Sequence, residues 1–156
     1  YGVTKPPVVM AGGGPVGGQT FTGKMSTFGG PNDMGVSPSE GLALCEPHEV
    51  DKFEGYFLSE QPPGTTGLAR RLDPASHYIA MRWDYAKTPR AWLQAHKVTV
   101  SANGKTFADV QPIDWGPNET TGREADLSPG LATALGLNTD DTCSVTIPAT
   151  TAAAVT

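Results

Sequence analysis

The dipeptide Asn103-Gly104 lies between two runs that alternate apolar and polar residues, 97–102 and 105–115. Asn-Gly is the favoured two-residue turn of a β-hairpin, because both positions need positive φ angles that Asn and Gly adopt at low cost. The segment therefore predicts an antiparallel hairpin, and this is the sharpest local signal in the chain.

Other segments add further expected strands. Residues 20–28, 77–83 and 142–148 are strand-like, and the short apolar run 41–46 is expected to be a buried strand. Residues 48–58 place apolar side chains at helical spacing and indicate a short helix. The 19 Gly and 14 Pro favour many turns and short strands over long helices.

The best-marked helix follows residue 128. Asp126 or Ser128 is expected at its N-cap, Pro129 lies at its first turn, and Gly136 ends it, so the helix is predicted over 129–135. About six strands with so few helices predict an all-β, closed or nearly closed barrel, since an open sheet could not cover both faces.

The chain length favours one domain. Residues 20–148 form the predicted barrel domain, residues 1–19 are a Gly/Pro-rich arm or linker, and residues 149–156 are expected to be a flexible tail.

Charge and composition exclude several classes of partner. Eleven basic and sixteen acidic residues give a net charge of −5 without a clustered basic face, so nucleic-acid binding is not expected. The sequence contains no apolar stretch of membrane-spanning length. The three His and two Cys lack metal-site spacing, so no metal or cofactor is expected. Cys45 and Cys143 lie in strand-like segments, which favours a disulfide between them over the alternative of two buried thiols.

The motifs from the hairpin onward resemble those of the double-psi β-barrel of rare lipoprotein A and its relatives, which include the expansins. That family carries a D-R-G-P turn, then a G-R-x-x-D-L-S step, then a helix of the AAALGL kind. Residues 114–117 read DWGP, with Trp115 in place of the Arg, and residues 122–128 read GREADLS. The similarity covers residues 96–148 well and the front half loosely, and residues 46–76 look like an insertion.

The resemblance implies a six-stranded double-psi β-barrel with one or two short helices, secreted or in the cell envelope. It also implies a cell-wall glycan as the partner. Some relatives cleave peptidoglycan strands as lytic transglycosylases, and others bind or cut cellulose. In catalytic relatives the Asp of the DLS step is the general acid, which by position is Asp126. Wall-lytic relatives carry an Ala-His pair where this chain has Ala80 and Met81.

Two functions follow as expectations. The first is a polysaccharide-active enzyme, a peptidoglycan or polysaccharide lyase or hydrolase, with Asp126 as acid and Asp114 or Glu40 assisting. The alternative is a non-catalytic carbohydrate- or protein-binding barrel, an inhibitor, or a component of a larger assembly attached through residues 1–19.

Each candidate acid has a plainer interpretation. A glycosidic general acid needs a raised pKa, whereas an Asp126 that caps the helix would have a lowered pKa. Ser128 as the cap would free Asp126. Asp114 is also expected to bond the turn that it begins, and Glu40 is equally well an exposed charge at a strand end.

Aromatic and basic residues complete the expected site. Trp115, Trp83 and Tyr85 are candidates for stacking on sugar rings, with burial in the core as the alternative for Trp83. Arg123 is expected either to bind substrate or to pair with an acid such as Asp114 or Glu119.

Overall fold

The computed structural model describes residues 18–149, so most of the predicted arm (1–19) and tail (149–156) lies outside the described residues. Six strands form a closed barrel in the order β1-β5-β2-β4-β3-β6. They are β1 (Gln19–Thr27), β2 (Tyr78–Met81), β3 (Val98–Ala102), β4 (Lys105–Trp115), β5 (Arg123–Leu127) and β6 (Thr142–Ile147). The pairs β1–β5 and β2–β4 are parallel and the other four are antiparallel. The all-β barrel is confirmed, and its mixed pairing is compatible with a double-psi arrangement.

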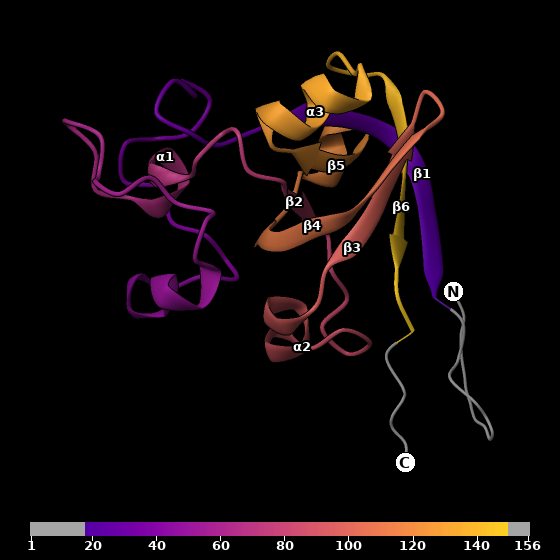
Figure 1. Cartoon of the computed structure of the whole chain (residues 1–156), viewed down its shortest axis with the longest axis horizontal. Helices are drawn as coiled ribbons and strands as arrows, with labels where there is room; N and C mark the ends of the chain where they lie inside the picture. Colours follow the sequence, from indigo (N-terminus) through magenta and orange to yellow (C-terminus); the bar gives the residue numbers. More distant parts are fainter. Residues whose placement is uncertain (1–17, 150–156) are drawn as a thin grey trace.

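Short helices lie around the barrel. Two are 3₁₀ helices, η1 (Pro47–Phe53) and η2 (Glu119–Thr121), and three are α-helices, α1 (Leu68–Arg71), α2 (Arg90–Ala95) and α3 (Pro129–Leu135). Residues 28–76 carry η1 and α1 and form a lobe beside the barrel, on the side away from β1 and β6 (Figure 1). In the part of the chain from 18 to 149, no helix has the length and apolar character needed to cross a membrane.

The predicted hairpin and helix are both confirmed. Asn103 and Gly104 have φ angles of 54° and 77°, and they connect β3 to β4. The side-chain amide of Asn103 donates to the carbonyl of Leu135 over 2.8 Å. The hairpin turn is therefore tied to the last turn of α3, which runs over the predicted residues 129–135.

One predicted strand is wrong and one strand was not predicted. Residues 41–46 form a turn with a single bridge between Leu42 and Cys45 instead of a strand. The strand that the sequence did not predict is β5, whose residues come directly before Ser128 and α3. Its buried residues Ala125 and Leu127 alternate with half-buried neighbours, but five residues paired in parallel to a distant strand leave little local signal.

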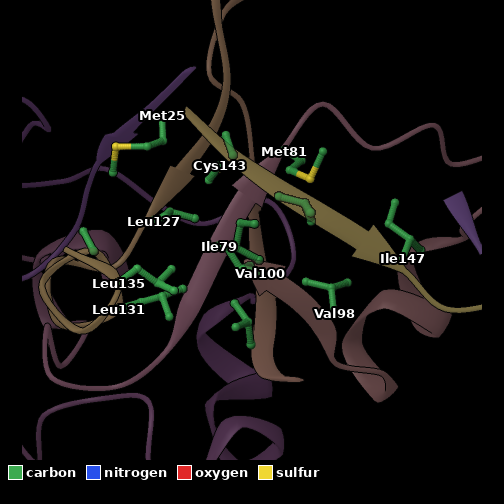
Figure 2. Close-up of a cluster of buried hydrophobic side chains, with 14 of the residues drawn as sticks. Met25, Ile79, Met81, Val98, Val100, Leu127, Leu131, Leu135, Cys143 and Ile147 are labelled. Atoms are coloured by element: carbon green, nitrogen blue, oxygen red, sulfur yellow. The ribbon is translucent and has the colours of Figure 1, made fainter. Parts of the chain in front are cut away.

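The main core fills the barrel interior. Figure 2 shows Ile79, Val100 and Leu127 from the strands meeting Leu131 and Leu135 of α3, which covers one end of the barrel. A second buried cluster lies on the outer face of β2 and β4, under the lobe. It contains Tyr78, Ala80 and Ile113 from the strands and Phe28, Phe53 and Leu72 from the lobe.

The predicted disulfide is wrong. Cys143 belongs to the barrel core and Cys45 to the second cluster, and both are free, buried thiols. Burial raises the pKa of Cys45 to about 12 and that of Cys143 to about 11. Two separate apolar clusters therefore each contain one unreactive thiol, which corresponds to the alternative that the sequence left open.

Ser128, not Asp126, caps α3. Its Oγ accepts a hydrogen bond from the Leu131 amide at 3.3 Å and is fully buried. We expect Ser128→Ala to lower the free energy of unfolding by about 1 to 2 kcal/mol, because two buried amides, those of Leu131 and Tyr78, lose their acceptor. Urea denaturation measures the change, with Thr133→Ala on the exposed side of α3 as the control. Equal midpoints for the two variants would contradict this assignment.

Candidate functional site

Four residues form a row across four adjacent strands on the outer face of the barrel. Ser26 of β1 is opposite Asp126 of β5, Asp126 is opposite Ala80 of β2, and Ala80 is opposite Asp114 of β4. Neighbouring strands are about 4.8 Å apart, so the backbones of the two Asp residues are about 9 to 10 Å apart. The row brings together the two carboxylates that the sequence had suggested.

The direction of the Asp126 side chain follows from strand alternation. Ala125 and Leu127 point into the barrel core, so Asp126 between them points outward. Ala80 likewise belongs to the outer cluster, whereas Ile79 and Met81 belong to the inner one. The outer face beside the lobe is therefore where any ligand of Asp126 would lie.

The strands β4 and β5, which carry Asp114 and Asp126, each contain a β-bulge close to that Asp. On β4 the register jumps from Pro112, opposite Ile79, to Asp114, opposite Ala80, so Ile113 is an extra residue. On β5 a similar jump makes Glu124 the extra residue. Such bulges redirect side chains and are frequent beside active sites.

One oxygen of the Asp126 carboxyl lacks a hydrogen-bond partner in the described part of the chain. This oxygen is Oδ1, and it is buried. Burial raises the pKa of Asp126 to about 6; Arg123 opposes this rise, Asp114 and Asp33 add to it, and Arg82 makes a smaller opposing contribution. A carboxyl that holds its proton at mildly acidic pH can donate that proton to a leaving group.

Asp114 is held by backbone amides. Its Oδ1 accepts from the amide of Ala43 at 2.8 Å and from the amide of Trp115 at 2.9 Å. Burial raises the pKa of Asp114, both hydrogen bonds lower it, and the charge of Glu40 raises it slightly. The expected turn bond is therefore present, and Asp114 is at the same time a member of the row. Glu40 is exposed and close enough to act on Asp114 through its charge.

Two exposed aromatic side chains lie at the Asp114 end of the row. Trp115 is 45% exposed and Tyr85 is 42% exposed. The charge of Asp114 contributes to the raised pKa of Tyr85, after the larger effects of burial and Arg90, so this ring lies near the carboxylate. The two rings offer apolar surface next to a carboxylate, which is the combination that sugar rings require.

Trp83 is not part of that surface, and its burial in the core corresponds to the alternative that the sequence left open. Its side chain is 5% exposed and packs in the barrel core. Its indole N–H donates to the carbonyl of Asp114 at 2.8 Å, and its own carbonyl accepts from the indole of Trp115 at 3.0 Å. Trp83 therefore supports the backbone of Asp114 and the ring of Trp115 from beneath.

Arg123 pairs with an acid that the sequence did not suggest. Its Nε donates to Oδ1 of Asp140 at 2.8 Å, so Arg123 pairs with an acid as expected, but with neither Asp114 nor Glu119. The reason is spatial, because Asp140 follows α3 and lies beside the start of β5. The charge of Arg123 still acts on Asp126 from the half-exposed rim.

A pocket of about 440 Å³ lies near the other end of the row, and its wall includes Thr27, Phe28, Asp33, Met34 and Pro129. Asp33 is a site residue that the sequence reasoning missed. Its two oxygens accept from the amides of Gly29 and Gly35, so it shapes the loop that follows β1. An Asp between glycines is typical of a turn and gives no sign of a pocket.

The residues from 18 to 149 contain no cluster of three or more His, Cys, Asp or Glu side chains placed to hold a metal ion. Compared with models of known protein families and with curated proteins, the chain matches none.

Proposed function

We propose that this barrel binds a polysaccharide of the cell envelope beside the row from Ser26 to Asp114, at the edge of the lobe, and cleaves it, with Asp126 as the general acid. The observation that carries this proposal is the buried, unpartnered Oδ1 of Asp126, whose pKa is raised to about 6, in line with a second carboxylate. The GREADLS motif and the closed six-stranded barrel support the same assignment.

The two carboxylates have the different surroundings that acid–base cleavage needs. Burial raises the pKa of Asp114, but two backbone amides oppose this rise and favour its ionised form, whereas Oδ1 of Asp126 has no donor within the described residues. In hydrolysis, Asp126 gives its proton to the glycosidic oxygen, and Asp114 takes a proton from the water that attacks the anomeric carbon. Inverting glycosidases hold their carboxyls about 6.5 to 9.5 Å apart, and two strand spacings are compatible with that range.

Release of soluble fragments tests the proposal. Purified peptidoglycan, cellulose and chitin are each incubated with the wild-type protein and with Asp126→Asn. Release from at least one glycan by the wild-type protein, and its loss in the variant, would support the proposal. Equal release by both proteins would remove Asp126 from the mechanism, and no release from any of the three by the wild-type protein would exclude cleavage of these glycans.

The second candidate function is glycan binding without cleavage. The observation that favours it is the exposure of Trp115 and Tyr85 at one end of the row. Retention of the wild-type protein on a glycan that it does not cleave would select this function. The secreted or cell-envelope location is part of both proposals.

Under either function, Trp115→Ala is expected to weaken retention on the bound glycan about tenfold. One aromatic face contributes about 1 kcal/mol or more when it stacks in an apolar contact, and 1.4 kcal/mol corresponds to a factor of ten. Trp115→Phe keeps a ring but loses the bond to Trp83, so it should retain most of the affinity. Depletion binding assays measure both variants, and unchanged binding by Trp115→Ala would place the glycan elsewhere.

A further inference from the structure

A buried carboxylate joins the lobe to the barrel through a network outside the row. Glu49 of η1 is 7% exposed. Its oxygens accept from Nη2 of Arg90 at 2.7 Å and Nη1 at 3.2 Å, from the amide of Gln94 at 3.0 Å and from Lys52 at 3.3 Å. These bonds, with one from the backbone amide of Glu46, hold the pKa of Glu49 well below its usual range. We call Glu49, Arg90 and Gln94 the Glu49 network.

The Glu49 network also holds the backbone of residues 43–44, which lies next to Asp114. Nε of Arg90 donates to the carbonyl of Ala43 at 3.0 Å, and the amide of Gln94 donates to the carbonyl of Leu44 at 2.9 Å. Residues 43–44 lie in the turn where a strand had been expected, so they lack the regular ladder that would otherwise fix them. Side chains from α2 supply part of that constraint, together with the Leu44 amide, which donates to the carbonyl of Ile113 at 3.3 Å.

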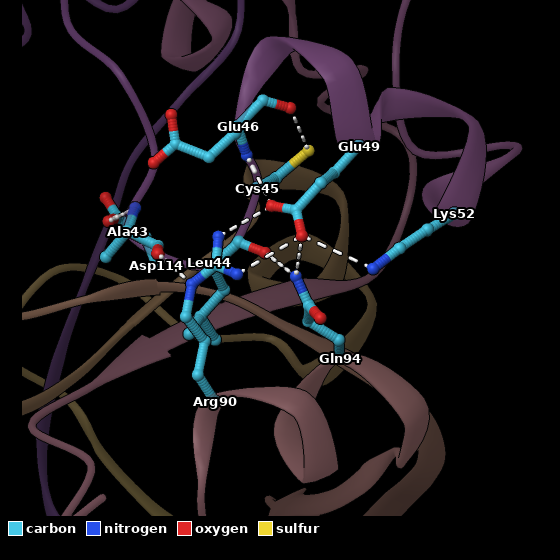
Figure 3. A network of polar contacts seen from close by, with 9 residues as sticks. All are labelled: Ala43, Leu44, Cys45, Glu46, Glu49, Lys52, Arg90, Gln94 and Asp114. Carbon is cyan, nitrogen blue, oxygen red and sulfur yellow. Dashed lines mark hydrogen bonds and ion pairs between the residues drawn. The ribbon is translucent and has the colours of Figure 1, made fainter.

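The same segment is hydrogen-bonded to one member of the row. The amide of Ala43 donates to Oδ1 of Asp114 at 2.8 Å. A continuous chain of contacts therefore runs from Glu49 through Arg90 and Ala43 to Asp114, and Figure 3 shows these residues side by side. Both amide bonds to Asp114 reach Oδ1, so together they fix how its carboxyl plane is turned.

We infer that Arg90, held by Glu49, is a positioning residue for Asp114: it fixes the Ala43 backbone so that the Ala43 amide donates to the Asp114 carboxylate. This bond orients Asp114 and favours its ionised form. The importance of that for turnover rests on the proposed function, whereas the link from Arg90 to Asp114 does not. The charge of Glu40, from the lobe, also acts on Asp114, and the charge of Asp114 acts in turn on Tyr85 in the loop after β2 and on Asp126 of β5.

A purely structural role makes a different prediction. If the Glu49 network only holds the lobe against the barrel, loss of Arg90 lowers stability and leaves the titration of Asp114 unchanged. If Arg90 positions Asp114, its loss frees Ala43, and Asp114 becomes harder to ionise. The protonation of Asp114 is therefore the informative measurement.

The variant is Arg90→Lys, which keeps the positive charge beside Glu49 but removes the Nε donor to Ala43. Carboxyl carbon shifts followed by NMR in the full chain report the titration of Asp114, and the amide shift of Ala43 reports its hydrogen bond. We expect the Asp114 titration to move upward by about half a pH unit or more, because a carboxylate that loses an amide donor is harder to ionise.

Arg71→Lys is the matched control. The Arg71 guanidinium also donates to backbone carbonyls of the lobe, those of Leu58 and Ser59, but these contacts do not lead to Asp114. We expect no change in the Asp114 titration for this variant. An unchanged Asp114 titration in folded Arg90→Lys, or an equal shift in Arg71→Lys, would overturn the inference.

If Arg90→Lys does not fold, Glu49→Gln decides instead. This variant weakens the pair that holds Arg90 in place, so a smaller upward shift of Asp114 supports the inference and an unchanged titration overturns it. The titration needs no substrate. A wild-type protein that cleaves no glycan would therefore contradict the proposed function. The titration of Asp114 would still test the inference about Arg90.

Discussion

Asp126→Asn is expected to reduce glycan cleavage by about 10²-fold or more and, at pH 7.5, to make the folded protein more stable. The amide cannot donate the proton that the carboxyl carries, so the chemical step loses its acid. Stability rises because the variant removes a carboxylate that folding has placed in a poorly solvated position without a partner for Oδ1.

The pH dependence of this stabilisation has a definite sign. In the folded protein the pKa of Asp126 is about 6, against an ordinary value of 3.8, so the folded state holds this proton more tightly than the unfolded state. The wild-type protein therefore loses stability as pH rises from about 4 to about 6 and loses no more from this group above that. Asp126→Asn does not show this loss, so its advantage appears above pH 6 and vanishes below about pH 4.

The expected gain is modest, because Asp126 keeps some contact with solvent. Two pKa units would correspond to almost 3 kcal/mol, and partial solvent screening reduces this to about 1 to 2 kcal/mol. Thermal unfolding should show a rise in Tm of about 3 to 6 °C at pH 7.5.

Asp51→Asn, a substitution on the exposed surface of η1, is the control for the change in net charge. A helix cap or a paired Asp126 would give the opposite sign, with Asn neutral or destabilising at pH 7.5. That result would contradict the environment described here. Full cleavage by a stabilised variant would instead leave Asp126 as a buried acid without a catalytic role.

The parts of the fold that the sequence predicts are those with local signals. Asn103-Gly104 specifies its turn through two positive φ angles, and α3 runs from Pro129 to the residue before Gly136 because a Pro and a Gly mark its two ends. The strand β5 carries no such marker. It pairs with β1, about a hundred residues earlier, and with β2, and only these distant partners make five residues a strand.

The same distinction holds for the site. Asp126 and Asp114 were found because short motifs contain them, and their meeting across Ala80 depends on a register that no local pattern contains. The unpaired oxygen of Asp126 is a property of packing and could not be predicted. The sequence left Asp126 and Ser128 as alternative caps of α3. Ser128 is the cap, and its buried hydroxyl also accepts a hydrogen bond from the backbone amide of Tyr78.

Residues that act over long distances were missed or misassigned. Arg90 and Glu49 are separated by 41 residues, and each is unremarkable in its own segment. Arg123 was expected to pair nearby in the sequence, but the turn after α3 brings Asp140 to it. Sequence spacing predicts which residues belong to one helix or one strand. Closure of the barrel brings together residues that are far apart in the sequence, and spacing does not predict those contacts.

Asp114→Asn is expected to reduce glycan cleavage by about 10²-fold or more and to lower the pKa of Asp126 below its wild-type value of about 6. The second effect follows because the charge of Asp114 is one of the causes that raise the Asp126 pKa. Activity that needs a protonated Asp126 should therefore be lost at a lower pH in this variant, so that the alkaline limb of any residual pH–rate profile moves to the acid side.

The choice of Asn separates charge from geometry. The side-chain oxygen of an Asn at position 114 can still accept from the amides of Ala43 and Trp115, so the turn and the support under Trp115 are kept. A role limited to bonding its own turn therefore predicts full activity for Asp114→Asn. Glu40→Gln is the matched control, because Glu40 acts on Asp114 from the exposed surface and is not among the groups that shift Asp126. NMR titration of Asp126 in the two variants distinguishes the cases. A shift in Asp114→Asn alone shows that the two carboxylates are coupled across Ala80, and an unshifted Asp126 in both variants would mean that the row is not an acid pair.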